Sequence, residues 1–195
     1  LGRYTYDILL KNGNQVIPIG RNPLGIKDEI IIDLIGVSEE ELIQRLGKFD
    51  VLIHIASVVD FNTFSNNELF EYNVISSLRL AKIVQNVGSR FIYVSTALIH
   101  GSKTHLITRS SKENPDTQYA LSKWLAEKVA QRCCNNVLIL RFCGIFGPKG
   151  PEHLRINKTI ENAIVNGYSP EIMGNGIGKR NYLYVKDAAS AISFA

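Results

Sequence analysis

Short apolar runs alternate with longer amphipathic stretches along this chain, and this alternation constrains the fold more than any other feature. Runs such as Val51–Ile55 and Val137–Leu140 are almost wholly apolar. Strands that are apolar on both faces are typical of a parallel sheet covered by helices on both sides. The pattern therefore predicts an α/β fold with a doubly wound parallel sheet.

The same pattern predicts the positions of the elements. We expect strands at 15–20, 29–33, 50–55, 91–95 and 137–142, and short extended pieces at 170–173 and 181–185. We expect helices at 4–11, 38–46, 66–87, 115–134, 152–166 and from 186 onward. Ser38 and Glu41 form a capping-box pattern that supports the second helix. Two prolines and two glycines at 147–151 interrupt the alternation, and we expect a boundary between two regions there.

Composition excludes several functional classes. The chain has 195 residues, of which 45% are hydrophobic and 21% charged, and this argues against disorder. Its net charge is +4, but the basic residues are spread out, so we expect neither a nucleic-acid nor a membrane partner. The longest apolar runs are far shorter than the ~20 residues that span a bilayer. Three cysteines without Cys/His ligand spacing predict no metal site and reduced thiols, which favours the cytoplasm.

Two Tyr-x-x-x-Lys patterns occur, Tyr119/Lys123 and Tyr182/Lys186. The first lies in the helix-like stretch Q-Y-A-L-S-K-W-L-A-E-K, where residues four apart share a face at about 5–6 Å. The second lies in an extended piece, where four residues span roughly 13 Å. Only the Tyr119/Lys123 pair is therefore expected to cooperate in proton transfer.

A tyrosine needs help to act as a base at neutral pH, because its ordinary pKa is ~10. The Lys123 ammonium, one turn from Tyr119, is expected to favour the phenolate. The substrate oxygen also needs a hydroxyl partner, for which Thr96 and its neighbour Ser95 are candidates. Both end the strand F-I-Y-V-S-T, and ligands of open α/β sheets lie at that edge. Alone, the two hydroxyls would indicate a turn or a helix cap.

Several further motifs, in order, give the chain a resemblance to a known family. They are L-G-R-Y-T-Y-D-I-L-L-K-N-G, V-L-I-H-I-A-S, Asn73-Val74, S-T-A-L-I-H-G, Y-A-L-S-K, L-R-F-C-G-I-F-G-P and G-N-G-I-G-K-R-N-Y-L-Y-V-K-D. Together they resemble the extended short-chain dehydrogenase/reductases of the NAD-dependent epimerase/dehydratase type. The resemblance implies a Rossmann-like NAD(P)-binding domain at 1–148 and a small substrate-binding region at 149–195.

The resemblance also implies residue roles. Thr96 would hold the substrate oxygen, Tyr119 would be the general acid/base, and Lys123 would lower the Tyr119 pKa and bind the nicotinamide ribose. The other implied contacts are Gly2 with the pyrophosphate, Asp33 and Leu34 with the adenine, Ala56 and Ser57 on the nicotinamide side, Asn73 with the cofactor, and Ser95 and Arg180 with the substrate. Arg141, His54 and His100 are expected to be structural.

The cofactor preference depends on Arg21. Members that bind NAD usually carry an acidic residue at the end of the second strand of the family, whereas this chain has Gly20-Arg21-Asn22. An arginine there suits the 2′-phosphate of NADP, so NADP is favoured and NAD is the alternative. Arg21 could instead be a solvated loop charge.

Departures from the family pattern narrow the expected reaction. Sugar 4,6-dehydratases follow the catalytic threonine with Asp-Glu, whereas this chain has Ala97-Leu98, which cannot move a proton. We therefore expect an oxidoreductase or epimerase that acts on a secondary alcohol or ketone, with a nucleotide sugar as substrate. The alternative is a non-catalytic NAD(P)-binding sensor or scaffold. A homodimer is a further hypothesis.

The position of Gly2 carries one more expectation. If Gly2 is the last glycine of the phosphate-binding loop, the first strand and the other loop glycines precede Leu1. We therefore expect the Rossmann-like fold to be incomplete at both ends of this sequence.

Overall fold

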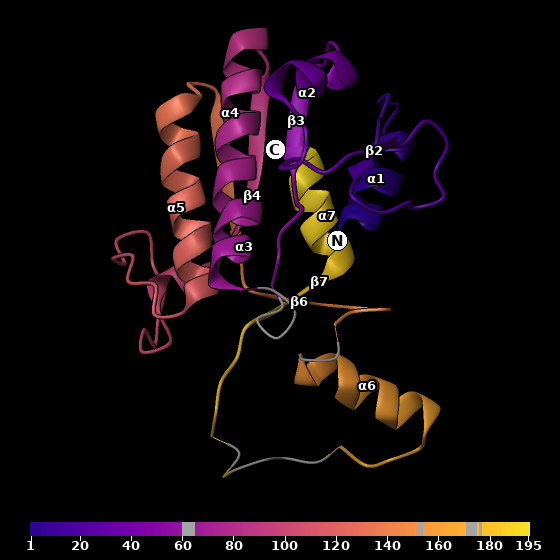
Figure 1. Ribbon diagram of the computed structural model, residues 1–195. Coiled ribbons are helices and arrows are strands. Elements are labelled where there is room, and N and C mark those ends of the chain that lie inside the picture. The colour runs from indigo at the N-terminus through magenta and orange to yellow at the C-terminus, as the bar shows by residue number, and fades with distance from the viewer. Residues whose placement is uncertain (60–64, 152–153, 171–174, 176) are drawn as a thin grey trace.

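The computed structural model describes residues 1–59, 65–151, 154–170, 175 and 177–195 (Figure 1). Its strands are β1 (Ile19–Gly20), β2 (Ile30–Ile31), β3 (Val51–His54), β4 (Arg90–Thr96), β5 (Val137–Phe142), β6 (Gly144–Phe146) and β7 (Tyr182–Tyr184). Its helices are α1 (Gly2–Lys11), α2 (Glu39–Leu46), α3 (Asn66–Phe70), α4 (Ser76–Val87), α5 (Gln118–Cys133), α6 (Arg155–Val165) and α7 (Val185–Phe194). Two short turns complete the order, the π-helical η1 (Glu71–Ile75) and the 3-10 turn η2 (Ala97–His100).

Every strand pair in the described residues is parallel, which confirms the predicted α/β class. The strands β3, β4 and β5 form one sheet in that order, β1 pairs with β2, and β6 pairs with β7. The prediction was a single sheet, whereas the described strands are hydrogen-bonded in three separate groups. One reason is that β1 is much shorter than predicted: Pro18 has no N–H and contributes only its carbonyl, which accepts from Ile30 N at 2.9 Å.

The core lies between the three-stranded sheet and the two helices α4 and α5, which run side by side across it in Figure 1. Phe91 and Tyr93 of β4 are fully buried, together with Val84 of α4 and Ala126 and Ala130 of α5. Burial of such side chains contributes about 1.5–3 kcal/mol each. The helices α1 and α7 pack against each other on the side of the molecule away from α5.

Several predicted boundaries are confirmed, and others moved for identifiable reasons. Ser38 caps α2 by accepting from Glu41 N at 3.1 Å, as predicted. The helix predicted from Pro115 begins at Gln118, because Thr117 is its N-cap and accepts from Ala120 N at 3.1 Å.

The stretch predicted as one helix at 66–87 is divided into α3, η1 and α4. Ser65 and Glu68 form a capping box at its start, which the sequence prediction missed. The five residues of η1 then form a π-helical turn, a distortion that often occurs at functional sites.

Beyond residue 147, α6 lies apart from the sheet (Figure 1), whereas β7 pairs with β6 and α7 packs against α1. Asn157 of α6 anchors the preceding loop: its Oδ1 accepts from Gly147 N at 3.2 Å, and its Nδ2 donates to Pro151 O at 3.0 Å. The predicted extended piece at 170–173 and the predicted start of α6 at 152 lie mostly outside the described residues. No helix in the described part of the chain is both long and apolar enough to cross a bilayer.

Candidate active site

The predicted catalytic residues lie at the carboxyl end of β4 and the start of α5. Thr96 is the last residue of β4 and is 9% exposed, and its Oγ1 accepts from Leu98 N at 3.2 Å. Tyr119 lies in the first turn of α5 and Lys123 one turn later. Ser95 is buried, and its Oγ has no hydrogen-bond partner among the described residues. Ser95 and Thr96 thus end β4, and Tyr119 and Lys123 lie in the first turns of α5, which packs against β4.

Burial dominates the electrostatics of this pair. It raises the pKa of Tyr119, while a hydrogen bond shared with the Ser57 side chain acts in the opposite direction. It also lowers the pKa of Lys123 to about 7, against the opposing charge of Glu127. The Lys123 Nζ lies 4.2 Å from the centroid of the Tyr93 ring. The net shift of the Tyr119 pKa is therefore upward, opposite to the effect expected of Lys123.

Asn73, on the π-helical turn η1, forms hydrogen bonds to two other segments of this site. Its Oδ1 accepts from Val58 N at 2.8 Å and from Ser57 Oγ at 3.2 Å, and its Nδ2 donates to Val58 O and to Ser122 Oγ at 3.0 Å each. The side chain is 1% exposed. Asn73 thus connects the loop after β3 to α5, and every hydrogen-bonding atom of its amide side chain has a protein partner.

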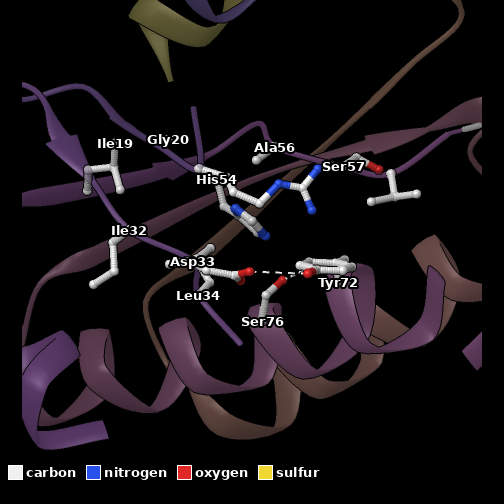
Figure 2. Close-up of a pocket in the computed structure, with 12 residues that line it drawn as sticks. Ile19, Gly20, Ile32, Asp33, Leu34, His54, Ala56, Ser57, Tyr72 and Ser76 are labelled. Atoms are coloured by element: carbon white, nitrogen blue, oxygen red, sulfur yellow. Dashed lines mark hydrogen bonds between the residues drawn. The ribbon is translucent and has the colours of Figure 1, made fainter. Parts of the chain in front are cut away.

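A cleft of about 150 Å³ lies beside these residues (Figure 2). Five residues predicted to bind the cofactor line it: Arg21, Asp33, Leu34, Ala56 and Ser57. The Arg21 guanidinium lies 4.9 Å from the centroid of the Tyr72 ring, and the Tyr72 hydroxyl donates to Asp33 Oδ2 at 3.1 Å (Figure 2). Ser57 belongs both to this cleft and to the hydrogen bond with Tyr119.

The lining of the cleft combines apolar and charged side chains. Apolar side chains of Ile19, Ile32 and Leu34 offer a surface for a flat base, while Asp33 and Arg21 offer an acceptor and a cation at its edge. His54 also lines the cleft, and its Nε2 is buried with no hydrogen-bond partner among the described residues. Burial lowers the pKa of His54 to about 3, with a smaller effect from the Lys123 charge, so the ring is neutral at pH 7.

Of the predicted site residues that do not line this cleft, Gly2 and Arg180 are also exposed to solvent. Gly2 is exposed at the start of α1, and no atom lies within 4 Å of the place where a Cβ would stand. Arg180 is exposed, two residues before β7.

Two supporting residues were missed by the sequence analysis. Arg79 of α4 donates to the carbonyls of Leu34, Ile35 and Val37, and so holds the loop that follows Asp33. Glu127 of α5 is fully buried and bonds to Arg141 of β5. The spacing of Glu127, four residues after Lys123, was a signal that could have identified it. In the described part of the chain, the hydrogen bonds of the Arg141 side chain go to Glu127 and Glu113, which is consistent with the structural role expected of it.

Comparison with known proteins extends these observations. The family model described as "NAD dependent epimerase/dehydratase family" matches residues 1–195. The curated relatives include a dTDP-D-glucose 4,6-dehydratase of Dictyostelium discoideum, 32% identical over 80% of this chain and 41% of that protein. They also include an uncharacterized UDP-glucose epimerase, YtcB, of Bacillus subtilis, 22% identical over 99% of this chain and 61% of that protein. The chain thus spans about half the length of these relatives.

Solved structures show the same fold. The UDP-glucose 4-epimerase of Thermotoga maritima with UDP-glucose has a TM-score of 0.83 at 21% identity, over 97% of this chain and 68% of that one. MoeE5 in complex with UDP-glucuronic acid and NAD has a TM-score of 0.82 at 23% identity, over 98% and 67%. These likenesses confirm the Rossmann-like fold.

The curated relatives include dehydratases as well as epimerases, so the comparisons do not support the expected exclusion of a 4,6-dehydratase. That expectation rests on Ala97 and Leu98 alone. The match of the family model along the whole sequence settles the family. The chain belongs to the NAD-dependent epimerase/dehydratase family.

Proposed function

We propose that this chain carries the catalytic centre of an NAD(P)-dependent epimerase or oxidoreductase that acts on a secondary alcohol or ketone of a nucleotide sugar. The observation that carries the proposal is the double role of Ser57, which lines the dinucleotide cleft and shares a hydrogen bond with Tyr119. This contact supports Tyr119 as a proton-transferring phenol beside the nicotinamide end of the cofactor site. Relatives of known structure, such as the Thermotoga maritima epimerase with UDP-glucose, support the substrate class.

The protein residues have distinct tasks in this proposal. Tyr119 exchanges a proton with the substrate oxygen, and the Thr96 hydroxyl holds the same oxygen. Lys123 stabilises the phenolate and holds the nicotinamide ribose, and Ser95 and Arg180 contact the substrate. Bound NAD(P) would supply the hydride acceptor or donor.

Four of the remaining cofactor contacts are proposed from the lining of the cleft: Asp33 and Leu34 would face the adenine end, and Ala56 and Ser57 the nicotinamide end. Gly2 lies outside the cleft and is proposed for the pyrophosphate from the sequence resemblance alone. Asn73 would act through the loop at Ser57 and Val58, because its own amide is fully engaged. The cofactor-binding part would comprise 1–148, and 149–195 would contribute to the substrate site.

We propose NADP as the preferred cofactor, with NAD as the alternative. The support is the position of the Arg21 guanidinium at the cleft, against the Tyr72 ring, where a 2′-phosphate could meet it. The dissociation constants of NADP and NAD decide the point. Arg21→Gln should weaken NADP binding by about tenfold or more and leave NAD binding nearly unchanged.

A 4,6-dehydratase is disfavoured in this proposal, because the two residues after Thr96 carry no titratable group. Leu98 is 51% exposed and Ala97 half-buried, and neither can transfer the proton that elimination of water requires. Analysis of the products by mass distinguishes the two reactions, since elimination lowers the mass of the sugar by one water and epimerisation leaves it unchanged.

The experiment that tests the proposed function is turnover by the intact protein on a panel of nucleotide sugars, with NAD and NADP each supplied in turn. Formation of an epimer, or a change in nicotinamide absorbance with one sugar nucleotide, supports the proposal. Dinucleotide binding with no turnover on the panel would contradict it and favour a sensor or scaffold. Light scattering of the same sample tests the proposed homodimer, for which we propose α4 and α5 as the contact surface.

A further inference from the structure

The Lys123 side chain is almost completely shielded from solvent, which is unusual for a cation. Its side chain is 2% exposed, and its Nζ lies 4.2 Å from the centroid of the buried Tyr93 ring. An aromatic face attracts a cation, but by far less than water does. The other titratable groups that influence this position are His54 on β3, whose ring is neutral, and Tyr119 and Glu127 on α5. Glu127 is the only negative charge among them.

The Glu127 carboxylate is in turn held by Arg141 of the neighbouring strand β5. It is fully buried, and both of its carboxylate oxygens accept from Arg141 of β5: Nε donates to Oε1 at 3.0 Å, and Nη2 donates to Oε2 at 2.6 Å. A bidentate pair of this kind fixes direction as well as charge. Arg141 reaches it from a neighbouring strand, so the carboxylate cannot turn away from the helix.

The network continues outward to a second carboxylate. Arg141 Nη2 also donates to Glu113 Oε1 at 2.5 Å, and Glu113 Oε2 accepts from Lys128 Nζ at 2.9 Å and from Trp124 Nε1 at 3.1 Å. Glu113 belongs to the loop between η2 and α5. The charges thus alternate along these contacts from Glu127 through Arg141 and Glu113 to Lys128, and Lys123 lies one turn before Glu127 on α5.

We propose that the ion pair of the buried Glu127 with Arg141 is a positioning device that favours the charged form of Lys123, which lies one turn earlier on the face of α5 that carries Tyr119. Without the negative charge on Glu127, Lys123 and Arg141 would be two neighbouring cations with only the outer Glu113 to balance them. Lys123 would then release its proton more easily, because desolvation already disfavours its charged form. The catalytic meaning of the pair rests on the proposed function, since the pair acts through Lys123.

The charge state of Lys123 can be measured directly, without any turnover. Lysine labelled with ¹³C at Cε is incorporated into the intact protein, the Lys123 signal is identified by its loss in Lys123→Arg, and its chemical shift is followed against pH. In the wild-type protein the midpoint is expected near 7. In Glu127→Gln it should fall by about one to two pH units, the effect of one charge removed at the ~6 Å of residues one turn apart in a medium of effective dielectric constant ~20.

Glu113→Gln is the matched control, because it removes the other carboxylate that bonds to Arg141. Its midpoint should stay within about 0.3 pH unit of the wild-type value, since Glu113 lies outside the pair and is partly exposed. The proposal is overturned if the Glu127→Gln midpoint equals the wild-type value, or if Glu113→Gln shifts it by as much.

Circular dichroism of each variant establishes that it is folded. If Glu127→Gln does not fold, Glu127→Asp decides: its carboxylate is retained but drawn back, so a smaller shift in the same direction supports the proposal and an unmoved midpoint contradicts it. If the wild-type protein turns over a nucleotide sugar, the fall of activity with rising pH should shift with the Lys123 midpoint. Absence of turnover would contradict the proposed function alone, because the titration still tests the pair.

Discussion

Replacement of Asn73 by alanine should destabilise the protein more than almost any other single polar change. The side chain is buried on a π-helical turn and makes four hydrogen bonds, two of them to the backbone of Val58. In Asn73→Ala the N–H and C=O of Val58 would lose their side-chain partner, whereas the Ser57 and Ser122 hydroxyls can reorient. At about 1–3 kcal/mol for each of these two polar groups left unpaired, the free energy of unfolding should fall by about 2–6 kcal/mol.

The assay is urea unfolding of the intact protein, followed by circular dichroism. Asn12→Ala is the control: its Nδ2 donates at 3.0 Å to Ser193 Oγ, but on the surface, so the loss should be about 0.5 kcal/mol or less. Because Ser57 and Val58 line the cleft, Asn73→Ala should also weaken dinucleotide binding. A loss of stability below about 1 kcal/mol in Asn73→Ala would refute the claim that the hydrogen bonds of Asn73 hold the loop after β3 against α5.

Three other predictions follow from particular contacts. Arg79→Leu should raise the dinucleotide dissociation constant by about tenfold with little change in kcat, because the carbonyls of the loop after Asp33 lose their hydrogen-bond donor. An unchanged dissociation constant in a calorimetric titration would argue against a role of Arg79 in holding this loop. Lys123→Met should stabilise the protein in urea unfolding, and by more at pH 6 than at pH 9. Burial lowers the pKa of Lys123 in the folded protein to about 7, so the wild-type protein gains stability as the pH rises from 7 toward the unfolded-state pKa of ~10.4. Equal stabilisation by the substitution at both pH values would contradict this reasoning. Gly101→Ala should lower the melting temperature more than Gly88→Ala. Both residues have φ near +79°, but only at Gly101 would an added Cβ lie 2.5 Å from a backbone oxygen, that of Asn114. Equal decreases in melting temperature would show that this contact does not affect stability.

Local patterns allowed the sequence to predict much of the fold. The capping box at Ser38, the apolar runs that became β3, β4 and β5, and the helical face shared by Tyr119 and Lys123 all depend on residues within one or two turns of each other. Such short-range signals are read directly from spacing.

Long-range contacts account for most of what could not be predicted. Asp116 was expected inside a helix, but its carboxylate accepts from Ser102 N at 2.7 Å, fourteen residues away, and the helix starts after it. Arg79 reaches carbonyls more than forty residues earlier in the chain, and Arg141 reaches Glu127 on another element. Such partners are defined only once the sheet and its helices are packed.

The candidate site shows the same division. The resemblance placed Asp33, Leu34, Ala56 and Ser57 around one cleft, and the structure brings them together with Arg21. It did not indicate that Asn73 would be fully engaged by the protein. Burial, which no local motif reveals, also determines the direction of the Tyr119 pKa.

The most direct test of the central claim is the rate of turnover of Tyr119→Phe on the nucleotide sugar that the wild-type protein accepts, measured together with dinucleotide affinity. Tyr119 does not line the dinucleotide cleft, so the dissociation constant should change by less than about twofold. Loss of the phenolic proton should lower kcat by about 10²-fold or more. Undiminished turnover in the folded variant would contradict the assignment of Tyr119 as the general acid/base.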